Sequence, residues 1–153
     1  MAQNKVFSWY GDDAPAICGM KADATIDTVD SYPAAEGGVN PGEPLMFADE
    51  EGNTVKKAGA SDASKMIGIA VHIHREPQTP YYEEGYAVPV MTMGDIWVRA
   101  LGDVKAHDSV GIAVDEETGE VGFVAGADGN NSVGFNFLDS GEKGDLVRVR
   151  IRQ

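Results

Sequence analysis

The spacing of apolar residues is the feature that most constrains the fold. From Leu45 onward, apolar side chains recur at every second position, which is the period of a β-strand and not the 3.6 of a helix. The clearest run is residues 146–152, where Val147, Val149 and Ile151 alternate with arginines. The chain also has 19 glycines and 7 prolines, and a glycine inside a helix costs about 1 kcal/mol relative to alanine. The sequence therefore predicts a mainly β fold with little helix.

Two earlier segments support this interpretation. Residues 66–74 place Ile67, Ile69, Val71 and Ile73 on one face of a predicted strand. Residues 86–100 form a longer run that is apolar on both faces at its start, as in a buried central strand. Gly94 interrupts this run, which indicates a bulge or a close approach of another backbone. Only residues 61–66 are predicted to form a helical turn.

An internal repeat appears within this β region. Residues 45–68 and 110–134 share the order apolar strand, acidic turn, glycine, valine, Ala-Gly-Ala and an aliphatic-glycine pair. We therefore expect a β domain at residues 45–153 built from two related hairpin units. A Pro- and Gly-rich arm and connecting segment at residues 1–44 precede it. Such units would form a small β-barrel or a β-sandwich-like domain.

Charge and cysteine content exclude several classes of protein. The chain has 12 lysines and arginines against 25 aspartates and glutamates, a net charge of −13. This sign argues against binding to nucleic acid or to an anionic membrane surface. Cys18 is the single cysteine, so neither an intrachain disulfide nor a thiolate zinc site can form. The N-terminus lacks the apolar core of a signal peptide, so we expect assembly in a reducing cytoplasm.

The sequence contains few residues or motifs that are typical of an enzyme active site. It has no G-x-S-x-G, GK[ST] or H-E-x-x-H motif. His72 and His74 could approach one metal from the same face of a strand, with Glu76 or His107 as a third ligand. The more common arrangement is two histidines on a solvent-facing strand surface. We predict no catalytic residue, no metal site, no cofactor and no small-molecule substrate.

Two acidic clusters also have a structural explanation. Asp49-Glu50-Glu51 and Asp115-Glu116-Glu117 lack the alternating oxygen ligands of a calcium loop. Each lies between alternating strands and is followed by a glycine, Gly52 or Gly119. Both clusters are therefore predicted to be hairpin turns.

The arm contains an aromatic cluster that needs a surface to pack on. Val6, Phe7, Trp9 and Tyr10 lie close together in an otherwise irregular segment. They either pack on their own domain or dock on a neighbouring subunit, and the sequence leaves both open.

The end of the chain carries the one local reversal of charge. Arg148, Arg150 and Arg152 form a basic stripe on one face of the last strand. Arginines so placed could pair with acidic groups of a sister subunit or a partner. The alternative is a solvated face neutralised by acidic residues of the same chain.

Three passages together carry a family resemblance. They read APAICGMKAD continuing to VDSYPAAEGGVNPGEPLMF, then MIGIAVH, then GYAVPVMTMGDIWVRALGDVKAHDSVGIAV. This order resembles the structural cement (capsid decoration) proteins of tailed bacteriophages. The central motif is carried by Gly94, Asp95 and Trp97. The chain departs from the family pattern at His107, where a glycine is commoner.

The resemblance implies a non-enzymatic, β-rich capsid protein. Such a protein would bind the outer surface of a phage head and stabilise contacts between major capsid protein subunits. It would associate with itself as a dimer or trimer, lie on the virion surface, and be made in the cytoplasm of an infected bacterium. The alternatives are a small β-barrel metal-binding module or enzyme using His72 and His74, or another virion component such as a head-completion or tail protein.

Overall fold

The structure is a computed structural model that describes residues 16–22, 26–73 and 81–152. In these residues the mainly β prediction is confirmed, with helix limited to a short 3-10 turn at Ala63–Lys65. The strands are β1 (Thr28–Pro33), β2 (Pro44–Phe47), β3 (Val55–Lys57), β4 (Gly68–Ala70), β5 (Ala87–Arg99), β6 (Ser109–Val114), β7 (Val121–Ala125), β8 (Ser132–Phe137) and β9 (Leu146–Ile151).

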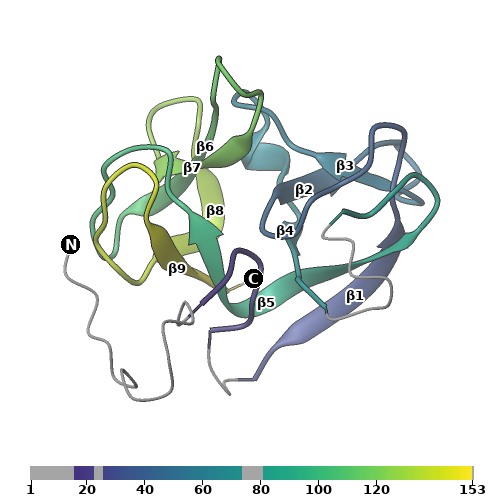
Figure 1. Cartoon of the computed structure of the whole chain (residues 1–153), viewed down its shortest axis with the longest axis horizontal. Helices are drawn as coiled ribbons and strands as arrows, with labels where there is room; N and C mark the ends of the chain where they lie inside the picture. Colours follow the sequence, from purple (N-terminus) through teal and green to yellow (C-terminus); the bar gives the residue numbers. More distant parts are fainter. Residues whose placement is uncertain (1–15, 23–25, 74–80, 153) are drawn as a thin grey trace.

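The strands form one antiparallel sheet that does not close into a barrel. Their order is β3-β2-β4-β5-β9-β8-β6-β7, and β1 pairs with β5 beside this path. Within the described residues the sheet ends at β3 and β7, so the sandwich-like alternative fits better than the closed barrel. Figure 1 shows two halves, with β1 to β4 in one and β6 to β9 in the other, and β5 crossing both.

Strand β5 joins the halves because it changes partners at Gly94. Its first part pairs with β1 and β4, and its second part pairs with β9. Gly94 has a φ of 129°. A Cβ there would lie 2.8 Å from the Cβ of Asp27. The close contact at Gly94 is therefore with the Asp27 side chain, while the nearest backbone atom, Asp27 Cα, would lie at 3.4 Å from such a Cβ. Glycine provides the space for this contact.

The two halves share one topology. The hairpin of β2 and β3 pairs with β4 in the order β3-β2-β4, and the hairpin of β6 and β7 pairs with β8 in the order β7-β6-β8. Both hairpins turn at a glycine with a φ of 73°, Gly52 or Gly119. Asp49 Oδ1 accepts a 2.9 Å bond from the Asn53 N–H, and Asp115 Oδ1 accepts one of 2.9 Å from the Glu117 N–H. The acidic clusters are hairpin turns, as predicted.

Backbone hydrogen bonds outside the two hairpins also correspond between the two halves. The Ala34 N–H donates to Tyr86 O at 2.9 Å, and the Ala100 N–H donates to Asp145 O at 2.9 Å. Isolated parallel bridges follow at both places, from Ala34 to Val55 and from Ala100 to Phe123. In the second half, the end of β5 thus holds the position that β1 holds in the first. The division at residue 44 stays a prediction, and β1 falls within its first segment.

The core follows this arrangement. A smaller cluster of buried side chains fills the first half and includes Leu45, Val55 and Val88. A larger cluster is built around the fully buried Phe123 and Phe137 of the second half and extends into the first half through Ile69 and Met91.

The strand predicted at residues 66–74 is shorter than expected. Only Gly68–Ala70 pairs as a strand, and Ile73 is 45% exposed. After Val71, whose N–H donates to Pro89 O, the His72 N–H donates to Gly19 O. The chain therefore leaves β5 for the N-terminal segment, and the alternation ends there.

The departure from the family pattern at His107 coincides with backbone strain. His107 has a φ of 73°, the one positive φ at a non-glycine residue in the described chain. Its N–H donates to Phe137 O at 2.8 Å. Gly42 occupies the position of the first half that corresponds to His107. It has a φ of 83°, and its N–H donates to Ala70 O at 2.7 Å.

Replacing this residue by glycine tests the strain. We expect His107→Gly to raise the free energy of unfolding by about 0.5–1 kcal/mol, because a left-handed side chain costs roughly 1–2 kcal/mol and glycine returns part of that as unfolded-state entropy. Urea denaturation measures the difference. His107→Ala keeps a Cβ and is expected to bring no gain, so an equal gain in both variants would contradict the assignment to backbone strain.

Candidate functional site

Strand β9 presents its arginines on one face, as its alternation predicts. Val147, Val149 and Ile151 are buried, and Arg148 and Arg150 lie on the opposite face. Arg152, just beyond the strand, is exposed.

Arg150 is bound to a buried carboxylate of the neighbouring strand. The β5–β9 register sets Asp95 opposite Arg150. Arg150 donates from Nε to Asp95 Oδ1 and from Nη2 to Oδ2, both at 2.8 Å. The Asp95 side chain is 1% exposed and that of Arg150 is 34% exposed. Two parallel charge-assisted bonds at such a buried carboxylate fix β9 on the second part of β5.

Arg148 is held in a similar way. Its Nε and Nη2 donate to the two carboxylate oxygens of Asp139 at 3.0 and 2.9 Å, and its backbone N–H donates to Oδ2 at 2.9 Å. The guanidinium carbon lies 5.8 Å from the Trp97 ring centroid. Burial alone raises the pKa of Asp139, but the bonds from Arg148 outweigh it and hold that pKa below its ordinary value. Asp95 and Trp97 of the central motif thus both contact arginines of β9.

This geometry bears on the predicted partner-binding residues. Arg148 and Arg150 have carboxylate partners within the chain, whereas Arg152 is exposed. Binding of a partner by the arginine stripe therefore stays a prediction. Val6, Phe7, Trp9 and Tyr10 lie outside the described residues, and docking by the arm stays a prediction too.

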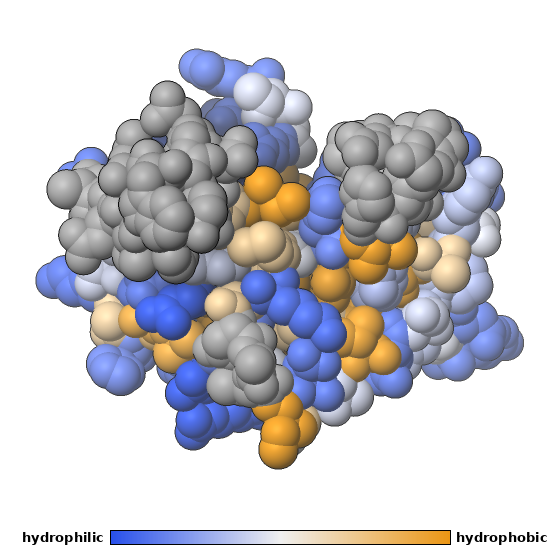
Figure 2. Space-filling model, turned by 60° about the horizontal axis from the view of Figure 1, so that its bottom comes forward, coloured by the Kyte–Doolittle hydropathy of each residue, from blue (hydrophilic) through white to orange (hydrophobic). Residues whose placement is uncertain are grey.

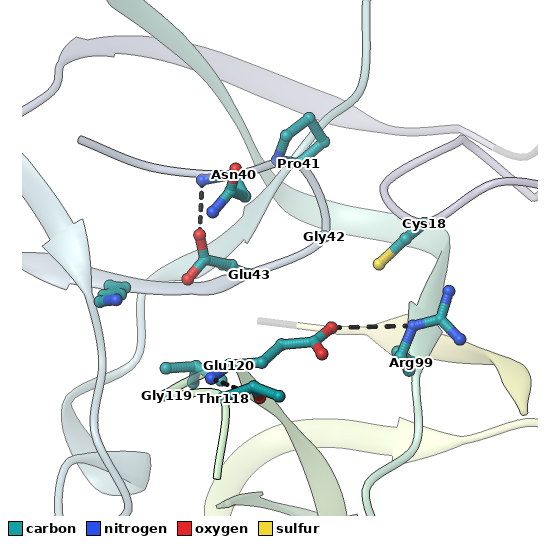
Figure 3. Close-up of a pocket in the computed structure, with 11 residues that line it drawn as sticks. Cys18, Asn40, Pro41, Gly42, Glu43, Arg99, Thr118, Gly119 and Glu120 are labelled. Atoms are coloured by element: carbon teal, nitrogen blue, oxygen red, sulfur yellow. Dashed lines mark hydrogen bonds and ion pairs between the residues drawn. The ribbon is translucent and has the colours of Figure 1, made fainter. Parts of the chain in front are cut away.

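A pocket lies between segments that are far apart in the sequence. It has a volume of about 320 Å³ and is lined by Cys18, by residues 40–43 and 118–121, and by Lys57 and Arg99. Figure 3 shows Glu43 turned toward Asn40, whose N–H it accepts, and Glu120 extended toward Arg99. The Arg99 Nε lies 3.7 Å from Glu120 Oε1. Sequence reasoning missed this pocket because its residues come from separate turns and strand ends that share no motif.

Two ionisable groups of the pocket have raised pKa values. Burial raises the pKa of Glu43, although the Asn40 N–H opposes the shift. Burial also raises the pKa of Cys18, against a bond from the Arg99 backbone. A thiol shifted upward stays protonated near neutral pH and is a poor nucleophile. Glu43 acts in the turn, as Asp108 does in the other half by accepting the Lys105 N–H at 3.1 Å.

The histidine alternative is only partly visible. His72 is half-buried, while His74 and Glu76 lie outside the described residues. Among residues 16–22, 26–73 and 81–152 no group of three or more His, Cys, Asp or Glu side chains could hold a metal ion. A metal site using His72 and His74 is neither supported nor tested by these residues.

Exposed apolar side chains are scattered. Figure 2 turns the lower side of Figure 1 toward the viewer and shows apolar spots separated by hydrophilic residues. The large exposed ones in the described chain are Ile17, Ile26, Ile73, Tyr81, Tyr86, Val114 and Val133. In the part of the chain that the structure covers, no helix has the length and apolar character needed to cross a membrane.

Comparison with known proteins decides between the remaining interpretations. Over residues 7–152 the sequence matches the family described as structural cement protein (E217 gp24/Pam3 gp6). The chain belongs to this family. The prediction of a capsid cement or decoration protein is thereby confirmed. None of the curated proteins matches the sequence.

Two solved structures share the fold of this cement protein. A chain from the capsid of Myoviridae phage XM1 superposes with a TM-score of 0.66 at 20% identity, covering 100% of this chain and 99% of that one. The head fiber gp8.5 N base of bacteriophage phi29 gives a TM-score of 0.55 at 15% identity, covering 83% of this chain and 95% of that one. At these identities the likeness concerns the fold alone.

Proposed function

We propose that this cement protein binds the outer surface of a phage head and stabilises contacts between major capsid protein subunits without catalysing a reaction. The observation that carries the proposal is the family match over residues 7–152. The protein would be made in the cytoplasm of an infected bacterium and act on the virion surface.

Self-association belongs to the same proposal. The protein would bind as a dimer or trimer that bridges neighbouring capsomers, and many weak contacts on one shell would act together through avidity. A density map of particles tests this directly. Copies on the outer surface between capsomers, in the hundreds per particle, are expected of a cement protein. A dozen or so copies at one vertex would instead indicate a head-completion or tail component.

The aromatic arm supplies the first test of binding. We expect deletion of residues 1–12 to abolish association with heads that lack the protein, while the thermal unfolding transition of the β fold remains. Full burial of an aromatic side chain of 150–250 Å² at about 25 cal/mol/Å² contributes roughly 4–6 kcal/mol before ordering costs. Co-sedimentation with purified heads measures the occupancy.

A variant of unchanged length tests whether binding needs the side chains of the arm or only its length. Replacing Val6, Phe7, Trp9 and Tyr10 by serine at unchanged length should lower occupancy as the deletion does. Unchanged occupancy of the truncated protein would show that the arm does not bind the head.

A further inference from the structure

Strand β1 has one edge paired with β5, and its other edge, called the free edge below, has no strand partner among residues 16–22, 26–73 and 81–152. The Ala34 N–H donates to Tyr86 O, and its carbonyl accepts from the Gly85 N–H, so Ala34 faces β5. Because neighbouring residues of an antiparallel strand face opposite edges, Asp30 and Tyr32 also face β5, whereas Val29 and Ser31 face away. Among the described residues, no backbone bond joins β1 to any segment but β5 before Ala34.

The matching edge in the other half is covered. The second part of β5 occupies the position of β1, and residues 19–22 lie along its outer edge. The Gly19 N–H donates to Trp97 O at 2.7 Å, and the Trp97 N–H donates to Met20 O at 2.9 Å. The Ala22 N–H donates to Asp95 O at 2.9 Å, and Lys21 bridges Ile96 in antiparallel fashion. An extended segment therefore completes the sheet there.

The strand registers connect the two edges residue by residue. Ser31 of β1 lies opposite Pro89 of β5, and at the equivalent position Trp97 of β5 lies opposite Arg148 of β9. In the same way, Val29 lies opposite Met91, and Asp95 lies opposite Arg150. The groups of β1 that correspond to those bonded by residues 19–22 are the N–H and C=O of Ser31 and the C=O of Val29. No described residue forms a backbone bond with these groups, which are a template for one more strand.

We propose that the free edge of β1 binds an extended, basic segment of the major capsid protein by antiparallel strand addition. This inference rests on the proposed function and names the contact through which the protein would bind the head. Main-chain bonds to an added strand supply affinity, and side chains of alternating residues supply specificity. Pro33, which lacks an N–H, limits the added strand at one end of the edge.

The negative charge around β1 favours a basic partner. Residues 22–43, which include β1, contain five acidic residues and no lysine or arginine. Asp27 is paired with Lys21 at 3.1 Å, while Asp30 on β1 is exposed. An incoming strand beside this edge therefore meets negative charge, which favours lysine or arginine at its exposed positions.

A second copy of this chain fits the edge poorly. Two-fold pairing of β1 with itself through Val29 and Ser31 would set Asp30 directly opposite Asp30 of the other copy. Shifting the register to centre on Ser31 would set Val29 opposite Pro33, which has no N–H to donate. Like charges directly opposite destabilise a strand pair, and both chains are strongly acidic.

The test removes the donor on the free edge and leaves the paired edge intact. Ser31→Pro lacks the outward N–H and places its ring where the added strand would lie. The control Ser31→Ala keeps the N–H. With cognate heads assembled without this protein, we expect Ser31→Pro to bind at least tenfold more weakly than wild type and Ser31→Ala to bind within twofold. Both should unfold within a few degrees of wild type. Wild-type affinity should fall with added salt.

The outcomes separate this inference from the proposed function. Wild-type affinity for Ser31→Pro overturns the strand addition and leaves the cement role intact, whereas heads that bind no wild-type protein overturn the cement role itself. A wild-type dimer that Ser31→Pro converts to monomer assigns the edge to a second copy and overturns the proposed occupant. If Ser31→Pro does not fold, amide hydrogen exchange of β1 in wild-type protein decides: protection on heads supports the inference, and unchanged exchange overturns it.

Discussion

Replacing Arg150 by alanine is expected to lower the free energy of unfolding by about 2–3 kcal/mol, because it leaves a buried carboxylate without its partner while the arginine itself is partly exposed. The substitution leaves the Asp95 carboxylate, with a side chain 1% exposed, without the two 2.8 Å bonds that now satisfy it. The β5–β9 pairing loses this bidentate side-chain contact. Urea denaturation at neutral pH measures the change.

The chain provides its own control for this prediction. Arg152, two residues further on, is exposed. Arg152→Ala should change the free energy of unfolding by no more than about 0.5 kcal/mol. The double variant Asp95→Ala/Arg150→Ala should be more stable than Arg150→Ala alone, because no buried charge is left unpaired. Equal losses for Arg150→Ala and Arg152→Ala would show that the pair does not support the fold.

This stabilising role affects how binding experiments on the arginine stripe are interpreted. Charge reversal at Arg148 or Arg150 would break bidentate bonds within the chain, to Asp139 and Asp95. A loss of head binding in such variants could then follow from unfolding and not from a lost contact. Arg152 is the stripe residue whose replacement tests partner binding with little change in stability.

The sequence predicted strands best where one face is buried. Alternation identified β9 and its inward Val147, Val149 and Ile151, and the long apolar run identified β5. Acidic residues followed by glycine identified both hairpin turns, because a positive φ at the turn requires glycine. These are local patterns, and each one depends on a few neighbouring residues.

Contacts between distant segments were not predictable. Asp95 stands out in the sequence only as part of the central motif, and the β5–β9 register brings it to Arg150. Asp139 follows β8, and its carboxylate reaches Arg148 on β9. Strand β1 shows no clear alternation because most of its side chains are exposed. The pocket is formed by turns and strand ends from both halves, so no single stretch of sequence carries its pattern.

The sequence singled out Gly68 without showing why a glycine is needed at this position. It stood out as part of an aliphatic-glycine pair that recurs at Val133-Gly134. In the structure, β4 lies so close to β5 that a Cβ on Gly68 would be 2.3 Å from Met91 O and 2.8 Å from Val90 Cγ1. The nearest atom belongs to the backbone of β5, so a side chain at this position cannot be accommodated by rotating its neighbour.

We therefore expect Gly68→Ala to lower the free energy of unfolding by about 2–3 kcal/mol, since overpacking in a tight core displaces backbone. Gly59→Ala is the matched control, because a Cβ there meets only Asp62 Oδ2, at 3.3 Å, and the change is expected within about 0.5 kcal/mol. Urea denaturation of both variants compares them. Because β4 links the β2–β3 hairpin to β5, Gly68→Ala should also loosen that hairpin, seen as faster amide exchange in residues 44–57 than in β8 and β9. Equal stability of the two alanine variants would mean that β4 can move away from β5 at little cost, and the close packing of these strands would then not be what requires glycine.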